Sequence, residues 1–267
     1  MTMRFKNSTI IMAALFGNKK HKVGIALSGG GARGFAHLGV LKALEEKGIK
    51  PDIISGTSAG AIAGVYIASG KSPDEVHEII KKRKLIDFVQ VRMPRTGLLN
   101  LEKLRNSLSE QISVNKIEDL ELPFIVAVSD IVNGKIKYFD KGPLVKLVQA
   151  SASIPVLFAP VEIDGLLYSD GGLFDNLPVK PLREITKKLI AVNVSPINKT
   201  DRLKNLIQIA ARTFHLSVSS TITGIEEQCD LVIEPPELDK YEILDASKAD
   251  EIFDIGYEYC KGLDIDF

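Results

Sequence analysis

The chain has 267 residues, of which 45% are hydrophobic and 25% are charged, so it is long enough to bury the core of one large α/β domain. Its 34 basic and 34 acidic residues cancel, which argues against a general electrostatic attraction to nucleic acid or to an anionic membrane. The two cysteines, Cys229 and Cys260, have no metal-binding or redox spacing, so we expect reduced, structural thiols in a cytoplasmic protein.

Residues 1–21 form a basic tail that contains one short apolar stretch, Ile10 to Phe16. The stretch is too short to span a bilayer, and no small-x-small cleavage site follows it, so we expect neither a membrane helix nor a signal peptide. A tail that packs on the domain or is disordered is the first interpretation, and a short interfacial anchor is the second. The domain itself is assigned to residues 22–267, because no repeat, low-complexity tract or linker interrupts them.

The domain opens with a strand, a helix, a second strand and a second helix. Residues 22–28 have the pattern of a buried strand and 35–47 that of a helix. Residues 52–55 then indicate another strand, and 59–69 an almost wholly apolar, buried helix. This order predicts a three-layer α/β/α fold with a mainly parallel central sheet and helices on both faces.

Later segments extend the same pattern. We expect a capped helix from Ser72 to about Arg83, an irregular connection over 84–100 and then a helix capped by Asn100. Strands are expected over 124–130 and within 187–195 and 229–235, with hairpin turns at Asn133-Gly134 and Asp164-Gly165. Two further helices are expected near 201–222 and 248–262. The connection over 84–100 is a hypothetical lid or membrane-facing rim, and a plain surface loop is the alternative.

Gly56-Thr57-Ser58-Ala59-Gly60 matches the G-x-S-x-G nucleophile elbow between a buried strand and a buried helix. Side chains at positions 56 and 60 would collide with the neighbouring strand and helix in so sharp a turn. The positive end of the following helix would assist ionisation of the Ser58 hydroxyl. The motif indicates a nucleophile, although a helix-capping serine in a tight turn would use the same residues.

A second motif, Gly29-Gly30-Gly31, precedes the first helix and offers consecutive backbone N–H groups to one anionic atom, with the charge of Arg33 beside them. Gly29, Gly31 and Gly34 also satisfy the dinucleotide fingerprint G-x-G-x-x-G. In dinucleotide-binding folds an acidic residue at the end of the second strand binds the ribose, whereas here Asp52 lies at the beginning of the predicted second strand. We therefore favour an oxyanion hole over a dinucleotide site.

Two residues are candidates for the base that the serine needs. Asp170 ends a strand and precedes Gly171-Gly172, so its carboxylate could reach the serine directly. His215 would complete the order Ser58, Asp170, His215 that is typical of α/β-hydrolases, but it falls in the middle of a predicted helix instead of a loop. We therefore interpret His215 as a helix-face residue.

The segments SGGGARG, GTSAG and SDGG, in this order, resemble the three motifs of the patatin-like phospholipase family, and the resemblance covers about residues 22–195. It implies a Ser-Asp dyad hydrolase that removes acyl chains from lipids without a metal or cofactor. By position, Ser58 would be the nucleophile, and Asp170 the general base that later activates water. The remaining matches are Gly29, Gly30 and Gly31 as the oxyanion hole, with Arg33, Gly56, Gly60, Gly171 and Gly172 in support.

The resemblance implies a phospholipid or lysophospholipid substrate and allows peripheral contact with the inner membrane surface. One departure is Ser28, where plant patatins carry aspartate. Two alternatives stay open: a small-ester esterase that uses a triad through His215, and a non-catalytic lipid-binding regulatory protein. The sequence carries no signal for head group, acyl position, chain length or oligomeric state.

Overall fold

The structure, a computed structural model, describes residues 21–82, 101–197, 203, 205–222 and 224–266. The predictions for the N-terminal tail, for the connection over 84–100 and for Asn100 lie outside these residues, apart from His21, which begins the first strand.

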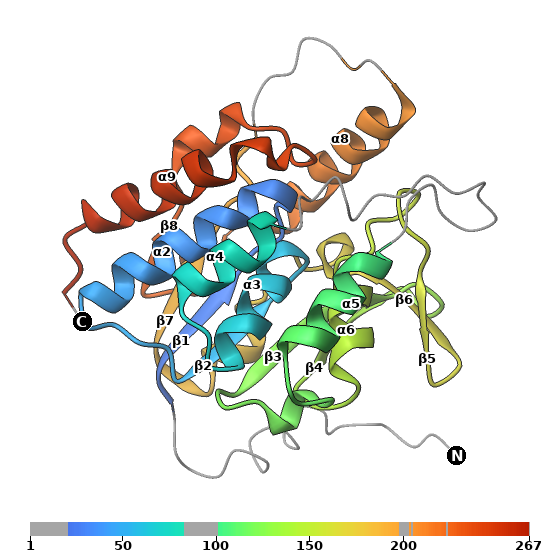
Figure 1. Cartoon of the computed structure of the whole chain (residues 1–267), viewed down its shortest axis with the longest axis horizontal. Coiled ribbons are helices and arrows are strands. Elements are labelled where there is room, and N and C mark those ends of the chain that lie inside the picture. The colour runs from blue at the N-terminus through green and yellow to red at the C-terminus, as the bar shows by residue number, and fades with distance from the viewer. Residues whose placement is uncertain (1–20, 83–100, 198–202, 204, 223, 267) are drawn as a thin grey trace.

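One sheet of eight strands organises the described part of the chain (Figure 1). Its strands are β1 (His21–Leu27), β2 (Ile53–Gly56), β3 (Phe124–Asp130), β4 (Lys135–Phe139), β5 (Val161–Ile163), β6 (Leu166–Asp170), β7 (Thr186–Val192) and β8 (Leu231–Ile233). They lie in the order β5-β6-β3-β2-β1-β7-β8, and β4 pairs with β3. Strands β8, β7, β1, β2 and β3 are parallel, whereas β4 and β6 run antiparallel to β3. The predicted mainly parallel sheet is confirmed.

The helices are α2 (Phe35–Glu46), α3 (Ala59–Ala68), α4 (Pro73–Lys82), α5 (Glu102–Gln111), α6 (Leu144–Ser151), α7 (Lys180–Arg183), α8 (Leu206–Ser219) and α9 (Ala249–Lys261). Short 3-10 turns occur at 31–34, 117–119, 171–173, 220–222, 236–240 and 246–248. Every helix in the described ranges is too short or too polar to cross a bilayer.

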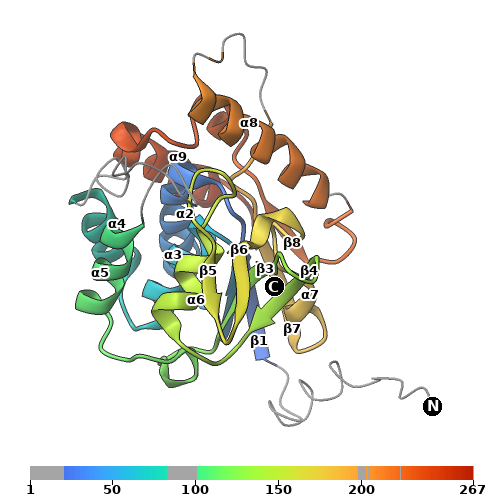
Figure 2. The same cartoon turned by 90° about the vertical axis from the view of Figure 1, so that its right-hand side faces the viewer.

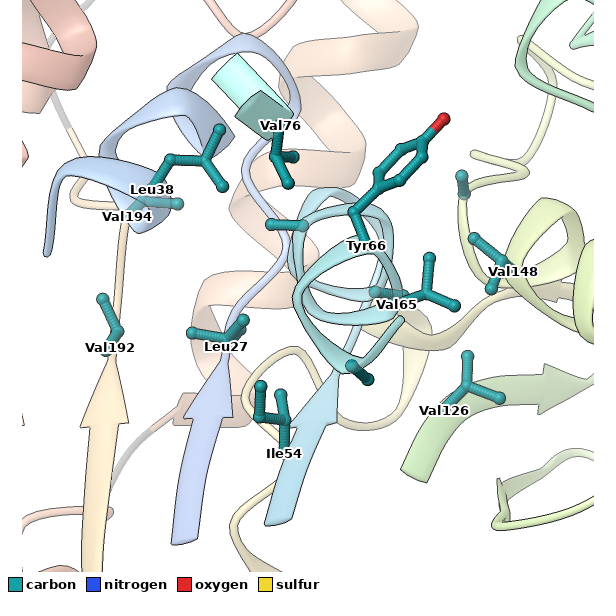
Figure 3. Packing of buried hydrophobic residues seen from close by; sticks show 14 of the residues in the cluster. Leu27, Leu38, Ile54, Val65, Tyr66, Val76, Val126, Val148, Val192 and Val194 are labelled. Carbon is teal, nitrogen blue, oxygen red and sulfur yellow. The ribbon is translucent and has the colours of Figure 1, made fainter. Parts of the chain in front are cut away.

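The two faces of the sheet are covered unequally. Along β1, Ile25 and Leu27 belong to the larger buried cluster and Ala26 to the smaller one, as the alternation of strand side chains requires. Figure 3 shows Val192, Leu27, Ile54 and Val126 on four adjacent strands below α3. Helices α2, α3, α4, α5, α6 and α9 lie on this side, whereas the four-residue α7 lies on the opposite side (Figure 2). Helices therefore cover both faces, as predicted, but the second layer is thin.

The start of α4 is a capping box, as the sequence predicts. The Ser72 N–H donates to Glu75 Oε2 at 2.8 Å, and the Glu75 N–H donates to Ser72 Oγ at 3.3 Å. Helix α5 begins after Leu101, which occupies its N-cap position and provides no side-chain cap.

Candidate active site

The topology brings the ends of β2 and β6 together. Strand β4 pairs with β3 from Val126 to Asp130, so β2 and β6 must share the opposite edge of β3. Strand β2 runs parallel to β3 and ends with Gly56 opposite Val126, and β6 runs antiparallel and ends with Asp170 opposite Val128. Their carboxyl ends therefore meet at the level of Ala127. The serine turn follows one end, and Asp170 is the other.

Ser58 lies at the tip of the turn between β2 and α3. Its backbone has φ 52° and ψ −118°, a strained conformation for a residue with a side chain, and the residue is 7% exposed. The Ser151 hydroxyl bridges this turn to β3, since it accepts the Ser58 N–H at 2.9 Å and donates to the Ala127 carbonyl at 2.7 Å. Ser151 was not predicted to have a role, because no sequence motif marks a serine within a helix.

Gly56 and Gly60 are required by close backbone contacts. A Cβ at Gly56 would lie 2.5 Å from the Gly60 carbonyl oxygen, and a Cβ at Gly60 would overlap the carbonyls of Leu27 and Ser28. The Gly60 N–H also donates to the Ser28 carbonyl at 3.1 Å. The two glycines let the turn pack directly on the end of β1, in agreement with the steric argument from sequence.

The Asp170 carboxyl group is completely buried beside Ser58. Burial raises the pKa of Asp170 from 3.8 to about 7, while the Ser58 hydroxyl and the Gly172 N–H both oppose this increase. Oδ1 accepts the Gly172 N–H at 2.8 Å, whereas Oδ2 has no hydrogen-bond partner among the described residues. The nearby Ser58 hydroxyl therefore influences the carboxylate without forming a full hydrogen bond to Oδ2. A carboxyl group with a pKa near 7 suits a general base at neutral pH.

Two serine hydroxyls hold the peptide group between Gly29 and Gly30. The Gly29 carbonyl accepts hydrogen bonds from Ser28 Oγ at 3.0 Å and from Ser195 Oγ at 2.8 Å. Because a peptide bond is planar and trans, the Gly30 N–H points away from these hydroxyls. The three glycines and Ser58 line the same small cavity, and the two serine hydroxyls leave this N–H free on the other side of the peptide group.

The three glycines of the loop are not equivalent. The Gly29 N–H donates to the Asn176 carbonyl at 3.0 Å, which commits it to the fold. Within the described residues no hydrogen bond occupies the N–H groups of Gly30 and Gly31. Of the three predicted oxyanion donors, Gly30 and Gly31 are therefore the two that remain available.

Arg33 has a different position from the one that we expected. Its guanidinium group is buried, at 2% exposure for the residue, and donates to the carbonyls of Pro196 at 2.7 Å, Tyr241 at 2.8 Å and Asp239 at 3.4 Å. Burial lowers the pKa of Arg33 to about 10. The side chain thus ties the glycine loop to the C-terminal segment, and its donors face backbone carbonyls instead of the serine.

His215 lines the small cavity, but it does not form a triad. Its Nε2 lies 3.3 Å from the Ser195 carbonyl oxygen, and burial, assisted by the charge of Arg33, lowers the pKa of His215 to about 4. Among the described residues no hydrogen bond joins its ring to Ser58 or Asp170. This geometry supports direct use of the carboxylate. In the same part of the chain, no three His, Cys, Asp or Glu side chains gather to hold a metal.

His37 supports the glycine loop from behind. Its Nε2 lies 2.8 Å from the Ser28 carbonyl oxygen, and burial lowers the pKa of His37 to about 4, so the ring is neutral at pH 7. A neutral ring that donates through Nε2 fixes this carbonyl together with the Gly60 N–H. His37 was not predicted to have a role, because the carbonyl that it contacts, that of Ser28, follows a different element, β1.

A larger, almost wholly apolar cavity of about 280 Å³ begins at Ser58. Side chains from α2, α3, α5 and the segment after α6 line it, among them Phe35, Leu38, Ile62, Ala63, Leu104, Ile154 and Phe158. Its polar wall is a hydrogen bond of 2.8 Å between the hydroxyls of Tyr66 and Ser107, both of them buried. The ring of Tyr66 extends from α3 away from the strands (Figure 3). This cavity can accommodate a hydrocarbon chain next to the serine.

Fold and site together define a mixed α/β protein with a nucleophile-elbow turn at the carboxyl edge of its sheet. The family model for patatin-like phospholipase matches residues 25–183, and the chain belongs to this family. An uncharacterised NTE family protein of Mycobacterium tuberculosis is 35% identical over 182 residues, which is 67% of this chain and 51% of that protein.

Lysophospholipase NTE1 of Scheffersomyces stipitis is 26% identical over 293 residues, which is 97% of this chain and 19% of that enzyme. The chain thus spans about half the length of the first of these curated relatives and about a fifth of the second. Among solved structures, VipD from Legionella pneumophila has the same fold, with a TM-score of 0.53 and 17% identity over 90% of this chain and 66% of that one.

Proposed function

We propose that the chain is a lipid acyl hydrolase that cleaves carboxylic esters through an acyl-serine intermediate on Ser58. One observation carries this proposal: a strained serine lies beside a buried carboxyl group with a pKa near 7 and also lines an apolar cavity. The family membership supports the same class of reaction.

Acylation follows from the positions of these groups. Asp170 accepts the proton of the Ser58 hydroxyl as Oγ attacks the ester carbonyl carbon. The Gly30 and Gly31 N–H groups stabilise the oxyanion that develops, and the peptide held by Ser28 and Ser195 orients the first of them. The leaving alcohol takes the proton from Asp170, which leaves the acyl group on Ser58.

The proposed substrate is a phospholipid or, preferably, a lysophospholipid. The apolar cavity beside Ser58 supports a fatty acyl chain, and a relative over nearly the whole length of this chain bears the name lysophospholipase. Helix α8 contributes Ile207 to the cavity and exposes Leu206, Ile209 and Leu216 nearby, which supports peripheral contact with a lipid surface.

A fluorophosphonate probe tests the proposal, because it labels only an activated serine. Wild type and the variants Ser58→Ala, Asp170→Asn and His215→Ala are treated with the probe and weighed as intact proteins. We expect one adduct on wild type and on His215→Ala, and none on the other two. Labelling that depends on His215 would instead favour the triad esterase. Folded wild-type protein that binds acyl lipid but takes no label would favour the regulatory alternative.

Release of fatty acid from lysophosphatidylcholine tests the substrate. We expect Ser58→Ala to lose about 10³-fold or more of this activity, because the variant lacks the group that forms the covalent intermediate. Circular dichroism and thermal unfolding check that the variant keeps its fold.

A further inference from the structure

Two buried polar atoms at the site form no hydrogen bond within the described residues, and the two residues that carry them border one cavity. They are Oδ2 of Asp170, a residue with 0% exposure, and Nδ2 of Asn176, a residue with 2% exposure. Both residues border the small cavity that Ser58, Gly30 and Gly31 also line. Unpartnered buried polar atoms are costly, so one acceptor and one donor at the same cavity indicate a polar occupant.

The cavity has room for a water molecule. It measures about 20 Å³, and a cavity needs roughly 10–15 Å³ to hold one water. We propose that this cavity binds the water that hydrolyses the acyl-serine, with Asn176 as the residue that positions it. The inference rests on the proposed function, because it concerns the second half of that reaction.

The two protein atoms define the orientation of such a water. The amide N–H of Asn176 donates to one lone pair of the water oxygen, and Asp170 Oδ2 accepts one of the water protons. The second lone pair is then free to face the acyl carbon on Ser58. Asn176 thereby selects the orientation in which the water is both deprotonated by Asp170 and directed at the carbonyl carbon.

Deacylation transfers the acyl group from Ser58 to the water. The water oxygen forms a bond to the acyl carbon while one water proton moves to Asp170 Oδ2. The bond between this carbon and Ser58 Oγ then breaks, and the proton passes from Asp170 to Ser58 Oγ. The products are a fatty acid and the free serine, so the cycle needs no further reactant.

The main chain holds Asn176 in place independently of its amide group. Its carbonyl accepts the Gly29 N–H at 3.0 Å, and its N–H donates to Thr221 Oγ1 at 3.1 Å. Thr221 Oγ1 in turn donates to the Val218 carbonyl at 2.7 Å, at the end of α8. Because the Gly29 contact still holds the Asn176 main chain, a substitution at Thr221 removes one neighbouring hydrogen bond and keeps Nδ2 in place, which provides a matched control.

The test separates the two half-reactions with a p-nitrophenyl ester of a medium-chain fatty acid. The burst of p-nitrophenol reports acylation, the steady state reports deacylation, and intact-protein mass measures the acyl-serine present. Wild type is compared with Asn176→Ala, Asn176→Asp and Thr221→Val. Asn176→Asp keeps the shape of the side chain but replaces the N–H donor, so it serves if Asn176→Ala does not fold.

We expect both Asn176 variants to keep a burst of about one equivalent and to lose at least tenfold in steady-state rate, so that acyl-enzyme accumulates. Added methanol or glycerol should divert a larger share of acyl groups to ester in these variants than in wild type. Thr221→Val should change the two phases by less than threefold.

The inference about Asn176 is overturned if burst and steady-state rates fall together in its variants, or if neither changes. It is also overturned if Thr221→Val accumulates as much acyl-enzyme as the Asn176 variants. Wild type that releases p-nitrophenol without any acyl adduct on Ser58 would refute the proposed function itself, and a failure at Asn176 alone would leave that function standing.

Discussion

At the scale of single residues, Asp170 links activity to pH. Its burial raises its pKa to about 7, and a general base must be deprotonated to accept a proton. We therefore expect kcat/KM for a soluble ester to rise with pH, with a midpoint near 7, and to level off above it. A pH profile between 5 and 9 checks this. A midpoint near 4, as for an exposed carboxyl group, would contradict the assignment of Asp170 as the base.

The same carboxyl group costs stability. Its folded-state pKa of about 7 lies above its ordinary value of 3.8, so the cost is absent below pH 4 and fully present above pH 7. We expect Asp170→Asn to abolish turnover but to raise the free energy of unfolding at pH 8, by an amount on the order of 2–4 kcal/mol. The gain should disappear towards pH 4 in urea titrations. The exposed Asp264→Asn is the control for the loss of one acidic residue.

The proposed nucleophile, Ser58, and the Asp170 carboxylate could be singled out from sequence, because each stands in a short motif with a fixed backbone context. Ser151, Ser195 and Asn176 could not, although they bond directly to the turn or to the glycine loop. Their role depends on which strand ends become neighbours, and a single sequence does not encode that neighbourhood locally. Arg33 illustrates the same limit, since its carbonyl partners lie more than 160 residues away.

At the scale of elements, the contact between α3 and the end of β1 depends on Gly60. A Cβ at this position would overlap the main-chain carbonyls of Leu27 and Ser28. These backbone atoms cannot move aside as the end of a flexible side chain could. We expect Gly60→Ala to lower the free energy of unfolding by about 1–3 kcal/mol and to reduce fluorophosphonate labelling. Gly262→Ala is the matched control, because its Cβ would meet no atom closer than 3.5 Å. Equal stability of the two variants would show that the turn can relax.

Element prediction succeeded where the pattern was strong. The strand over 124–130, the two hairpin turns and the opening strand-helix-strand-helix order are confirmed. Helix α6 was missed, because eight residues between a hairpin and an irregular segment give little more than two helical turns of pattern. The hairpin between β5 and β6 was predicted. The pairing of β6 with β3, which brings Asp170 towards Ser58, was not predicted, because tertiary contacts decide which strands become neighbours.

At the scale of the whole molecule, the apolar cavity should set the length of the acyl chain. Its wall includes Ala63, and Ala63→Leu adds three carbon atoms there. In a close-packed interior, we expect the preferred acyl chain to shorten by about three methylene groups. Fatty acid release from lysophospholipids of graded chain length measures this. Ser107→Ala, which removes a hydroxyl without adding bulk, should leave the optimum within about one methylene group. An unchanged optimum in Ala63→Leu would place the chain elsewhere.

The glycine loop, Gly29 to Gly31, is held by residues that follow the family-matched segment of 25–183. Ser195 fixes the Gly29 carbonyl, the Ile243 carbonyl accepts the Ala32 N–H at 2.8 Å, and Arg33 bonds to carbonyls from Pro196 to Tyr241. Helix α9 packs along α2, the helix that follows the loop (Figure 1). The three motifs alone therefore do not include the residues that hold the glycine loop in place. A graft or a truncation that stops at the last motif would therefore keep Ser58 but lose the residues that hold the glycine loop beside it.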